Sequence, residues 1–373
     1  MTDDSLFQKL AGGDVVKSLS AIESFLENER ENIVAYSMPW WKRLWCYRHG
    51  FYSYSGVLYG LDRHNVGEYL SDLERRRATS INRTHWKVAQ LKIAFHEVLA
   101  HTHPHLLVDI VATFQDGELY PIPSADPGET VEELLDGLEN GSPLVAKPVG
   151  GWAGSGVFSI ARTEEGFSVD GVPIRRDSLE AKLRGLDGYL LERSVEQAEY
   201  AATIYPHSAN TLRIMTMVDP DTREPFIGAT VHRFGTDDSR PVDNWSAGGV
   251  CSAVDTETGR VEPVTAKPKS GPPTFVENHP DTGATIDGTT VPSWDIVRDT
   301  VLSVADEYKH LWRYLGWDVV VTDHDGSIVI LEANARPDID LMQVHEPLLA
   351  DPRVRRFYEH HGVLSNERGV FLT

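Results

Sequence analysis

The sequence has few cysteines, no long apolar run and no recognisable secretion signal. Among its 373 residues, Cys46 and Cys251 are the only cysteines, and their distance along the chain gives neither a disulfide framework nor metal-ligand spacing. The first residues, MTDDSLFQKL, lack the basic and apolar regions of a signal peptide. No apolar stretch approaches the ~20 residues that a membrane span needs. We therefore expect a cytoplasmic protein with free thiols and no membrane insertion.

Positive charge is also scarce. Lys and Arg number 35 against 56 Asp and Glu, so the net charge is −21 at pH 7. Such an excess of negative charge disfavours non-specific binding to nucleic acid or to anionic membranes. Arginine outnumbers lysine and aspartate is abundant, a composition that suits high salt. We expect a halophilic protein that loses its fold and activity when salt is removed.

The length and the local patterns predict more than one folding unit. We expect a mainly helical, aromatic-rich region over residues 1–90, a first lobe over residues 91–205 and a second lobe over residues 206–373. A spacing of apolar residues near 3.6 predicts a helix over residues 15–33. The aromatic stretch 38–60 could stack on bases, but the acidity of the chain favours a packed aromatic layer.

Two later stretches also have helical spacing. Residues 84–103 predict one amphipathic helix with Lys92 in its middle, and residues 297–316 predict a long helix that Gly316 ends. Between them lie short apolar runs separated by turns, which indicate strands and an α+β fold. The Pro-, Gly- and Thr-rich segment 263–292 is predicted to be a surface excursion.

A glycine-rich segment, KPVGGWAGSGV, begins at Lys147 between two strand-like runs. Because no helix follows it, it is neither a P-loop nor a Rossmann turn. One interpretation is a flexible hairpin with its lysine in water. The other is a cradle whose backbone N–H groups donate to phosphate oxygens. Its small residues are Gly150, Gly151, Gly154, Ser155 and Gly156.

The runs WDVVVTD and SIVILEAN, joined by HDG, predict a hairpin near the C-terminus. A three-residue loop favours glycine at its last, left-handed position, where Gly326 stands. Closure of the loop by Asp323 and Ser327 would place Asp318 directly opposite Glu332. A bulge in either strand would shift this register by one residue.

In that register, Glu332 and Asn334 share one face of the sheet, and Leu331 and Ala333 point to the other. Two carboxylates opposed across a sheet destabilise it, but a divalent cation between them reverses the effect. Oxygen ligands from Asp318, Glu332 and Asn334 suit Mg²⁺ that also binds phosphate. The alternative is a solvated acidic face in an acidic protein.

Taken together, KPVGGWAGSGV, YLLER and the distant GWDVVV and VILEANARPD resemble the ATP-grasp superfamily. The stretches NTLRIMT, VDNWSAGGV, VDTETGR and EANARPDIDLMQ are similar to those of sugar-transfer-associated ATP-grasp proteins. The likeness covers roughly residues 85–350. It implies an α+β fold with two lobes that grip ATP. It also implies a Mg-ATP-dependent ligase that joins a carboxylate to an amine through an acyl-phosphate.

The resemblance also implies roles for individual residues. Lys92 and Lys147 would contact the ATP phosphates beneath the glycine-rich segment, and Arg213 would face the transferred phosphoryl group, so Lys147 and Arg213 are the candidate catalytic residues. Backbone groups of Leu190 and Leu191 would contact the adenine edge, Glu192 would lie beside adenine and ribose, and Glu199 would hold the ribose. The candidate Mg²⁺ ligands are Asp318, Glu332 and Asn334.

Two questions stay open at this point. The polar residues near these motifs either shape an acceptor pocket or tie loops together; they are His232, Arg233, Asp243, Asn244, Trp245, Arg336 and Asp340. The same ATP site would also serve a phosphotransferase or a nucleotide-binding scaffold in glycan assembly. Residues 1–90 lack the alternating strands and helices common in the superfamily, so the carboxylate and amine substrates are not indicated.

Overall fold

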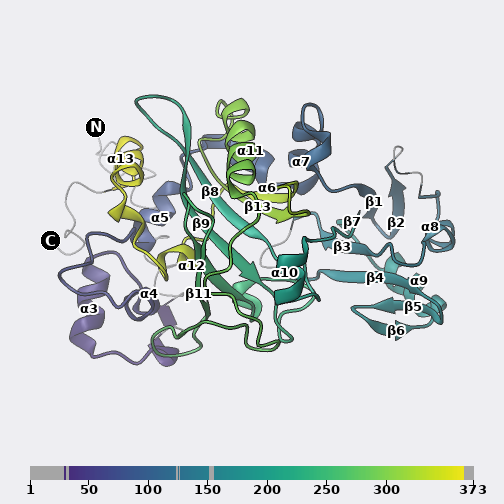
Figure 1. The fold of residues 1–373 in the computed structure, drawn as a ribbon, viewed down its shortest axis with the longest axis horizontal. Coiled ribbons are helices and arrows are strands. Elements are labelled where there is room, and N and C mark those ends of the chain that lie inside the picture. Colours follow the sequence, from purple (N-terminus) through teal and green to yellow (C-terminus); the bar gives the residue numbers. More distant parts are fainter. Residues whose placement is uncertain (1–28, 31–32, 123–124, 126, 151–154, 365–373) are drawn as a thin grey trace, which may run out of the picture.

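Two seven-stranded antiparallel sheets organise the protein (Figure 1). The computed structural model describes residues 29–30, 33–122, 125, 127–150 and 155–364. Most of the predicted helix over 15–33 and the residues Gly151 and Gly154 lie outside this set. The predicted α+β fold with a helical N-terminal region is confirmed. Within the described residues, no helix has the length and apolar character that crossing a membrane requires.

The first sheet has the strand order β2-β1-β7-β3-β4-β5-β6. Helices α8 (Val131–Gly137) and α9 (Arg176–Arg184) pack on it through a buried apolar cluster that includes Leu135 and Leu183. Strands β3 and β4 pair antiparallel, so the glycine-rich segment does join two neighbouring strands. The strands are β1 (Ile110–Gln115), β2 (Glu118–Pro121), β3 (Leu144–Pro148), β4 (Phe158–Thr163), β5 (Gly166–Val169), β6 (Val172–Ile174) and β7 (Tyr189–Arg193).

The second sheet has the order β12-β11-β10-β9-β8-β13-β14. Segment 263–292, predicted as a surface excursion, contributes part of β11 and all of β12 to its edge. The strands are β8 (Leu212–Val218), β9 (Pro225–Phe234), β10 (Val250–Val254), β11 (Val261–Ala266), β12 (Phe275–Val276), β13 (Tyr314–Val321) and β14 (Ile328–Asn334).

Helices cover both faces of the second sheet (Figure 1). One face, with Leu212 and Ile214, packs under α6 (Trp86–Gln90), α7 (Lys92–Ala100) and α11 (Trp294–Glu307). The other face, with Met215 and Met217, packs under the N-terminal helices and the end of the chain. These elements are α3 (Trp40–Arg48), α4 (Ser53–Leu58), α5 (Asp72–Ala78), α12 (Asp340–Gln343) and α13 (Pro352–His360). A further short helix is α10 (Glu199–Ile204).

The predicted boundaries at residues 91 and 206 stay a prediction, and the packing of α7 bears on the first of them. Phe95 and Leu99 of α7 are buried with Trp317 of the second sheet in one cluster. This packing favours assigning α7 to the second lobe rather than to the first. The predicted aromatic layer is present for Phe51, Tyr54 and Tyr59, which are buried.

Two helix predictions were wrong. The predicted helix over 84–103 is broken at Leu91, which has an extended backbone, so Lys92 begins α7 instead of lying mid-helix. The helix predicted to end at Gly316 ends at Glu307, and Gly316 lies inside β13. A side chain at position 316 would meet Pro337 at 2.9 Å and Arg213 at 3.0 Å. Glycine is therefore needed there for close packing and not as a helix cap.

The C-terminal hairpin keeps the predicted pair Asp318–Glu332 for a different reason. Its loop has four residues, because Thr322 N donates to Ser327 O, and Gly326 has the expected positive φ of 88°. A β-bulge at Leu331 then restores the register that the predicted three-residue loop would have given.

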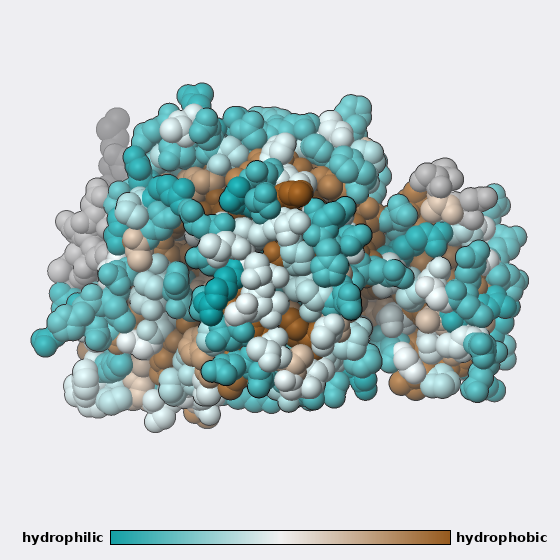
Figure 2. All heavy atoms as spheres, viewed as in Figure 1, coloured by the Kyte–Doolittle hydropathy of each residue, from teal (hydrophilic) through white to brown (hydrophobic). Residues whose placement is uncertain are grey.

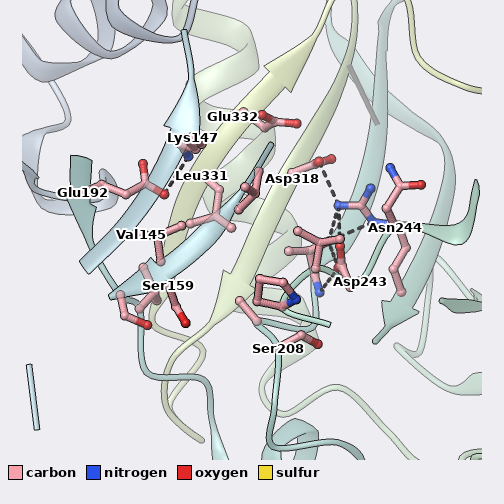
Figure 3. A pocket seen from close by; sticks show the side chains of 18 of the residues that line it. Val145, Lys147, Ser159, Glu192, Ser208, Asp243, Asn244, Asp318, Leu331 and Glu332 are labelled. Atoms are coloured by element: carbon pink, nitrogen blue, oxygen red, sulfur yellow. Dashed lines mark hydrogen bonds and ion pairs between the residues drawn. The ribbon is translucent and has the colours of Figure 1, made fainter. Parts of the chain in front are cut away.

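The bulge also changes which side chains share a face. Ile328, Ile330 and Ala333 all point into the apolar layer under α11, so the parity of the strand reverses at Leu331. Leu331 lines the same cavity as Glu332, and the prediction that it points away was wrong (Figure 3). Without the bulge, Glu332 would point into the apolar layer.

His232 on β9 is fully buried and stacks on Phe234 with ring centroids 4.2 Å apart. It faces away from Arg233, because neighbouring residues of a strand point to opposite faces. Its Nε2 lies 2.9 Å from the Tyr200 hydroxyl. Burial lowers its pKa to about 3. His232 is therefore a core residue and does not shape a pocket.

This buried histidine predicts a specific loss of stability in acid. The unfolded ring takes up a proton below about pH 6.5 while the native ring stays neutral, so stability falls as the pH decreases towards the native pKa. Between pH 7 and pH 5, the wild type should lose about 2 kcal/mol more unfolding free energy than His232→Gln. Urea unfolding at both pH values measures this difference. Equal losses in the two proteins would contradict the neutral buried state.

Candidate active site

A cavity of about 860 Å³ lies between the two sheets. In the space-filling view, the outline is indented where the first sheet meets the main body (Figure 2). Lys147 and Glu192 reach the cavity from the first sheet, and Asp318, Glu332 and Asn334 reach it from the second. Residues that the sequence places far apart, on β3, β7, β13 and β14, therefore meet at one site.

Lys147 is the buried cation of the first sheet. It lies on β3 beside β7, is 8% exposed, and places Nζ 2.6 Å from Glu192 Oε1 (Figure 3). Burial raises the pKa of Glu192, although the Lys147 ammonium group opposes the rise. Lys147 is therefore buried beside a carboxylate and does not lie in open water, as the flexible-hairpin interpretation would require.

Lys92 connects the helical layer to the same site. Its Nζ lies 3.5 Å from Glu332 Oε2. The break at Leu91 places Lys92 in the first turn of α7, next to β14. Glu332 is also close enough to Glu192 to raise the pKa of that buried carboxyl further. Two lysine–glutamate pairs thus lie close together where the sheets approach each other.

Asp318 is held by two arginines. Arg213 Nε donates to Oδ1, and Arg213 Nη2 donates to Oδ2 at 2.8 Å. Arg233 Nη2 donates to the same Oδ2 at 2.9 Å. Burial alone would raise the pKa of Asp318, but the two guanidinium charges outweigh it and hold the pKa below its usual value.

Arg233 is positioned by Thr211 and Asp243. Thr211 Oγ1 accepts from Arg233 Nη2 at 2.6 Å and donates to Asp243 Oδ2 at 2.6 Å. Asp243 Oδ1 lies 3.3 Å from Arg233 Nη2. Burial raises the pKa of Asp243 against the opposing charge of Arg233. The guanidinium group is therefore fixed from two sides before any ligand binds.

The residues present fit the predicted Mg²⁺ site. Among the described residues, no three His, Cys, Asp or Glu side chains gather as a metal-binding group. The predicted set consists of two carboxylates and one amide. Asp318 and Glu332 are directly opposed, and Asn334 follows on the same side of β14. Asn334 Nδ2 is buried with no hydrogen-bond partner in the described chain. The carboxylate and amide oxygens of these three side chains suit a hard cation that also binds phosphate.

The described part of the glycine-rich segment borders the cavity. Ser155 lines it, whereas Gly150 is exposed and does not. Gly156 has a φ of 79°, and a side chain there would meet the Tyr189 hydroxyl at 2.6 Å. Gly156 is thus required by backbone conformation and by close packing against β7.

Three further predicted residues do not line the cavity. Leu191 lies in β7, which has β1 and β3 on its two sides, and its side chain is fully buried. The Glu199 side chain is 85% exposed and approaches His324 at 3.8 Å. Asp340 accepts from the Tyr59 hydroxyl at 2.8 Å and pairs with Arg75, beneath the N-terminal helices. Arg233, Asp243, Asn244, Trp245 and Arg336 do line the cavity.

Several lining residues were not predicted. Arg75 and Gln90 come from the helical N-terminal region, and the segment from Arg193 to Gln197 follows β7. No motif marks Arg75 or Gln90, because only the packing of the N-terminal helices on the second sheet brings them there. The segment after β7 could have been found, since the residues that follow a strand end are the ones free to contact a ligand.

Two antiparallel sheets that enclose a cavity between a strand lysine and an Asp-Glu-Asn set define an ATP-grasp protein. The chain belongs to the sugar-transfer-associated ATP-grasp family, whose model matches residues 81–357. A comparison with curated proteins finds no match.

Solved structures of ATP-grasp enzymes are similar at a distance. The ATP-grasp ligase PsnB, complexed with a phosphomimetic variant of minimal precursor, Mg and ADP, is 12% identical with a TM-score of 0.40. This likeness covers 75% of the present chain and 62% of PsnB. VanG D-Ala:D-Ser ligase from Enterococcus faecalis is 12% identical with a TM-score of 0.38, over 73% and 62% of the two chains.

N5-carboxyaminoimidazole synthetase from Staphylococcus aureus, complexed with ADP, is 10% identical with a TM-score of 0.37. The likeness covers 68% of the present chain and 46% of the synthetase. The chain thus spans less than two thirds of the length of each of these three enzymes. Such distant likeness carries neither an activity nor a substrate to this chain.

The buried pairing of Arg213 with Asp318 predicts strong coupling between the two residues. Asp318→Asn should lower the unfolding free energy by about 3–5 kcal/mol, because it leaves two buried guanidinium groups without their shared carboxylate. Arg213→Met should cost less, since Arg233 still pairs with Asp318. The double variant should be at least 1 kcal/mol more stable than the sum of the single effects predicts. Urea unfolding of the four proteins measures the coupling, and additive effects would contradict it.

Proposed function

We propose that the protein is a Mg²⁺- and ATP-dependent ligase that joins a carboxylate to an amine. One observation carries the proposal: Lys147 and the oxygens of Asp318, Glu332 and Asn334 line a single cavity from two separate sheets. The ammonium group of Lys147 would contact the phosphates of ATP. The oxygens of Asp318, Glu332 and Asn334 would bind a cation that also contacts these phosphates. The two sheets can therefore hold one triphosphate between them.

The chemistry that this arrangement supports has two steps. A carboxylate oxygen attacks the γ-phosphorus of ATP, the bond to ADP breaks, and an acyl-phosphate forms. An amine nitrogen then attacks the acyl carbon, inorganic phosphate leaves, and the nitrogen loses a proton. Phosphoryl transfer spreads negative charge over the phosphoryl oxygens, so positioned cations supply most of the catalysis.

The residues divide this work between the two sheets. Lys147, already desolvated beside Glu192, would bind phosphate oxygens at little further cost in hydration. Mg²⁺, when bound at Asp318, Glu332 and Asn334, would neutralise phosphate charge. Arg213 and Arg233 stand against Asp318 and would stabilise the transferred phosphoryl group. The segment from Arg193 to Gln197, rather than Leu191 and Glu199, is the proposed contact for adenine and ribose.

The experiment that tests the proposal uses hydroxylamine as a general amine. The protein is incubated with Mg-ATP, hydroxylamine and a panel of carboxylic acids, and ADP, phosphate and hydroxamate are measured. A ligase releases ADP, phosphate and hydroxamate in equal amounts with at least one acid. ADP with a stable phosphorylated product would identify a phosphotransferase. Nucleotide binding without ADP formation would identify a scaffold.

Lys147→Met should weaken ADP binding at least tenfold, because the variant leaves Glu192 buried and removes the cation that faces the phosphates. The matched control is Lys182→Met, since Lys182 is an exposed lysine of the same sheet domain that packs over Phe158. Calorimetric titration with Mg-ADP measures both affinities. An unchanged affinity in Lys147→Met would remove the cradle interpretation.

A further inference from the structure

Two cations that line the cavity, Arg193 and Arg336, have no anionic partner among the described residues. Seven lysine and arginine side chains line the cavity. Five pair with carboxylates; they are Arg75, Lys92, Lys147, Arg213 and Arg233. Arg193 lies exposed at the end of β7. Arg336 is partly buried, and no carboxylate pairs with it among the residues that the structure describes.

The Arg336 guanidinium group is nevertheless held in place. It lies over the ring of Trp86 on α6, 4.1 Å from the ring centroid. Stacking contacts the face of the guanidinium group and leaves the N–H donors along its edge unused. Its Nε is buried and has no hydrogen-bond partner in the described chain. The guanidinium group of Arg336 is thus held in place with free N–H donors in one plane, an arrangement that suits a carboxylate.

Two further buried polar atoms on the same wall have no partner among the described residues. They are Oε1 of Gln90 and Nδ2 of Asn334, and both residues line the cavity. Gln90 lies one helical turn after Trp86 on α6, so the two side chains share a side of that helix. Helix α6 packs on β14, which carries Asn334 just before Arg336. Buried polar atoms are nearly always paired in proteins, so unpaired atoms gathered on one wall indicate a missing ligand.

We propose that Arg336, stacked on Trp86, and Gln90 form the subsite for the acid substrate. Arg336 binds a carboxylate, and Gln90 Oε1 accepts a hydrogen bond from a hydroxyl or amino group next to it. The substrate class is then a hydroxy acid or an amino acid. This inference rests on the proposed function, because it assigns one substrate of the proposed reaction.

The position of Trp86, Gln90 and Arg336 indicates that the anion bound there belongs to the acid substrate and not to the nucleotide. The nucleotide phosphates are assigned to Lys147, on the first sheet, and to Lys92. Trp86 and Gln90 belong to the helical N-terminal region, and Arg336 follows β14 on the second sheet. The region before residue 91 thus supplies part of the acid subsite.

The test uses three acids with one carbon skeleton: lactate, alanine and propionate. Each is titrated into the protein saturated with Mg-ADP, and affinity is measured by calorimetry. The wild type should bind lactate or alanine at least tenfold more tightly than propionate. Gln90→Leu should lower the affinities for lactate and alanine to that for propionate. Arg336→Met should abolish saturable binding of all three acids. The affinity for Mg-ADP should stay within twofold in both variants.

Arg336→Lys keeps the charge without the planar edge, so it should restore part of the binding if Arg336 acts on the anion. Absence of saturable binding of all three acids to the wild type, with Mg-ADP bound, would overturn the inference alone. Weaker Mg-ADP binding in Arg336→Met would assign the residue to the nucleotide and would overturn it as well. Loss of Mg-ADP binding in the wild type would instead contradict the proposed function.

Discussion

The alternation of side chains along the second sheet is the constraint on which the rest of the structure depends. The face that packs Met215 and Met217 against the N-terminal helices also carries Arg213 and Asp318 at the cavity. One face of the sheet is therefore apolar where it packs against the N-terminal helices and charged, a few residues further on, where it lines the cavity. The β-bulge at Leu331 makes this possible on β14, because it turns Glu332 out of the apolar layer and into the cavity.

Charge pairing stabilises the charged residues of the cavity before any ligand binds. Buried charges destabilise a protein unless each has a close partner, and here Lys147 has Glu192 while Asp318 has two arginines. The paired groups are also preorganised, since their positions are fixed by strands and not by loops. Ligand binding can then exchange one charged partner for another without the full cost of desolvation. Arg336 differs because, within the described part of the chain, it has an aromatic ring and no carboxylate as its partner.

Strand register predicted the set Asp318, Glu332 and Asn334, and the resemblance to the ATP-grasp superfamily implied that Lys147 would lie with them. The four residues line one cavity. The hairpin loop is one residue longer than predicted, and a bulge compensates for it. The break at Leu91 could not be predicted, since no glycine or proline marks it. The resemblance placed Leu191 and Glu199 at the site. Strand β7, however, ends at Arg193, two residues beyond Leu191, so the residues near the cavity come after Leu191. Arg75 and Gln90 depend on long-range packing that no local pattern encodes.

The account rests on one nucleotide bridging the two sheets. A crystal structure of the protein with Mg²⁺ and a non-hydrolysable ATP analogue tests this most directly. The account predicts a triphosphate that contacts Lys147 on one side and, through the cation, Asp318, Glu332 and Asn334 on the other. A nucleotide bound elsewhere, or bound to one sheet with no contact to the other, would contradict it.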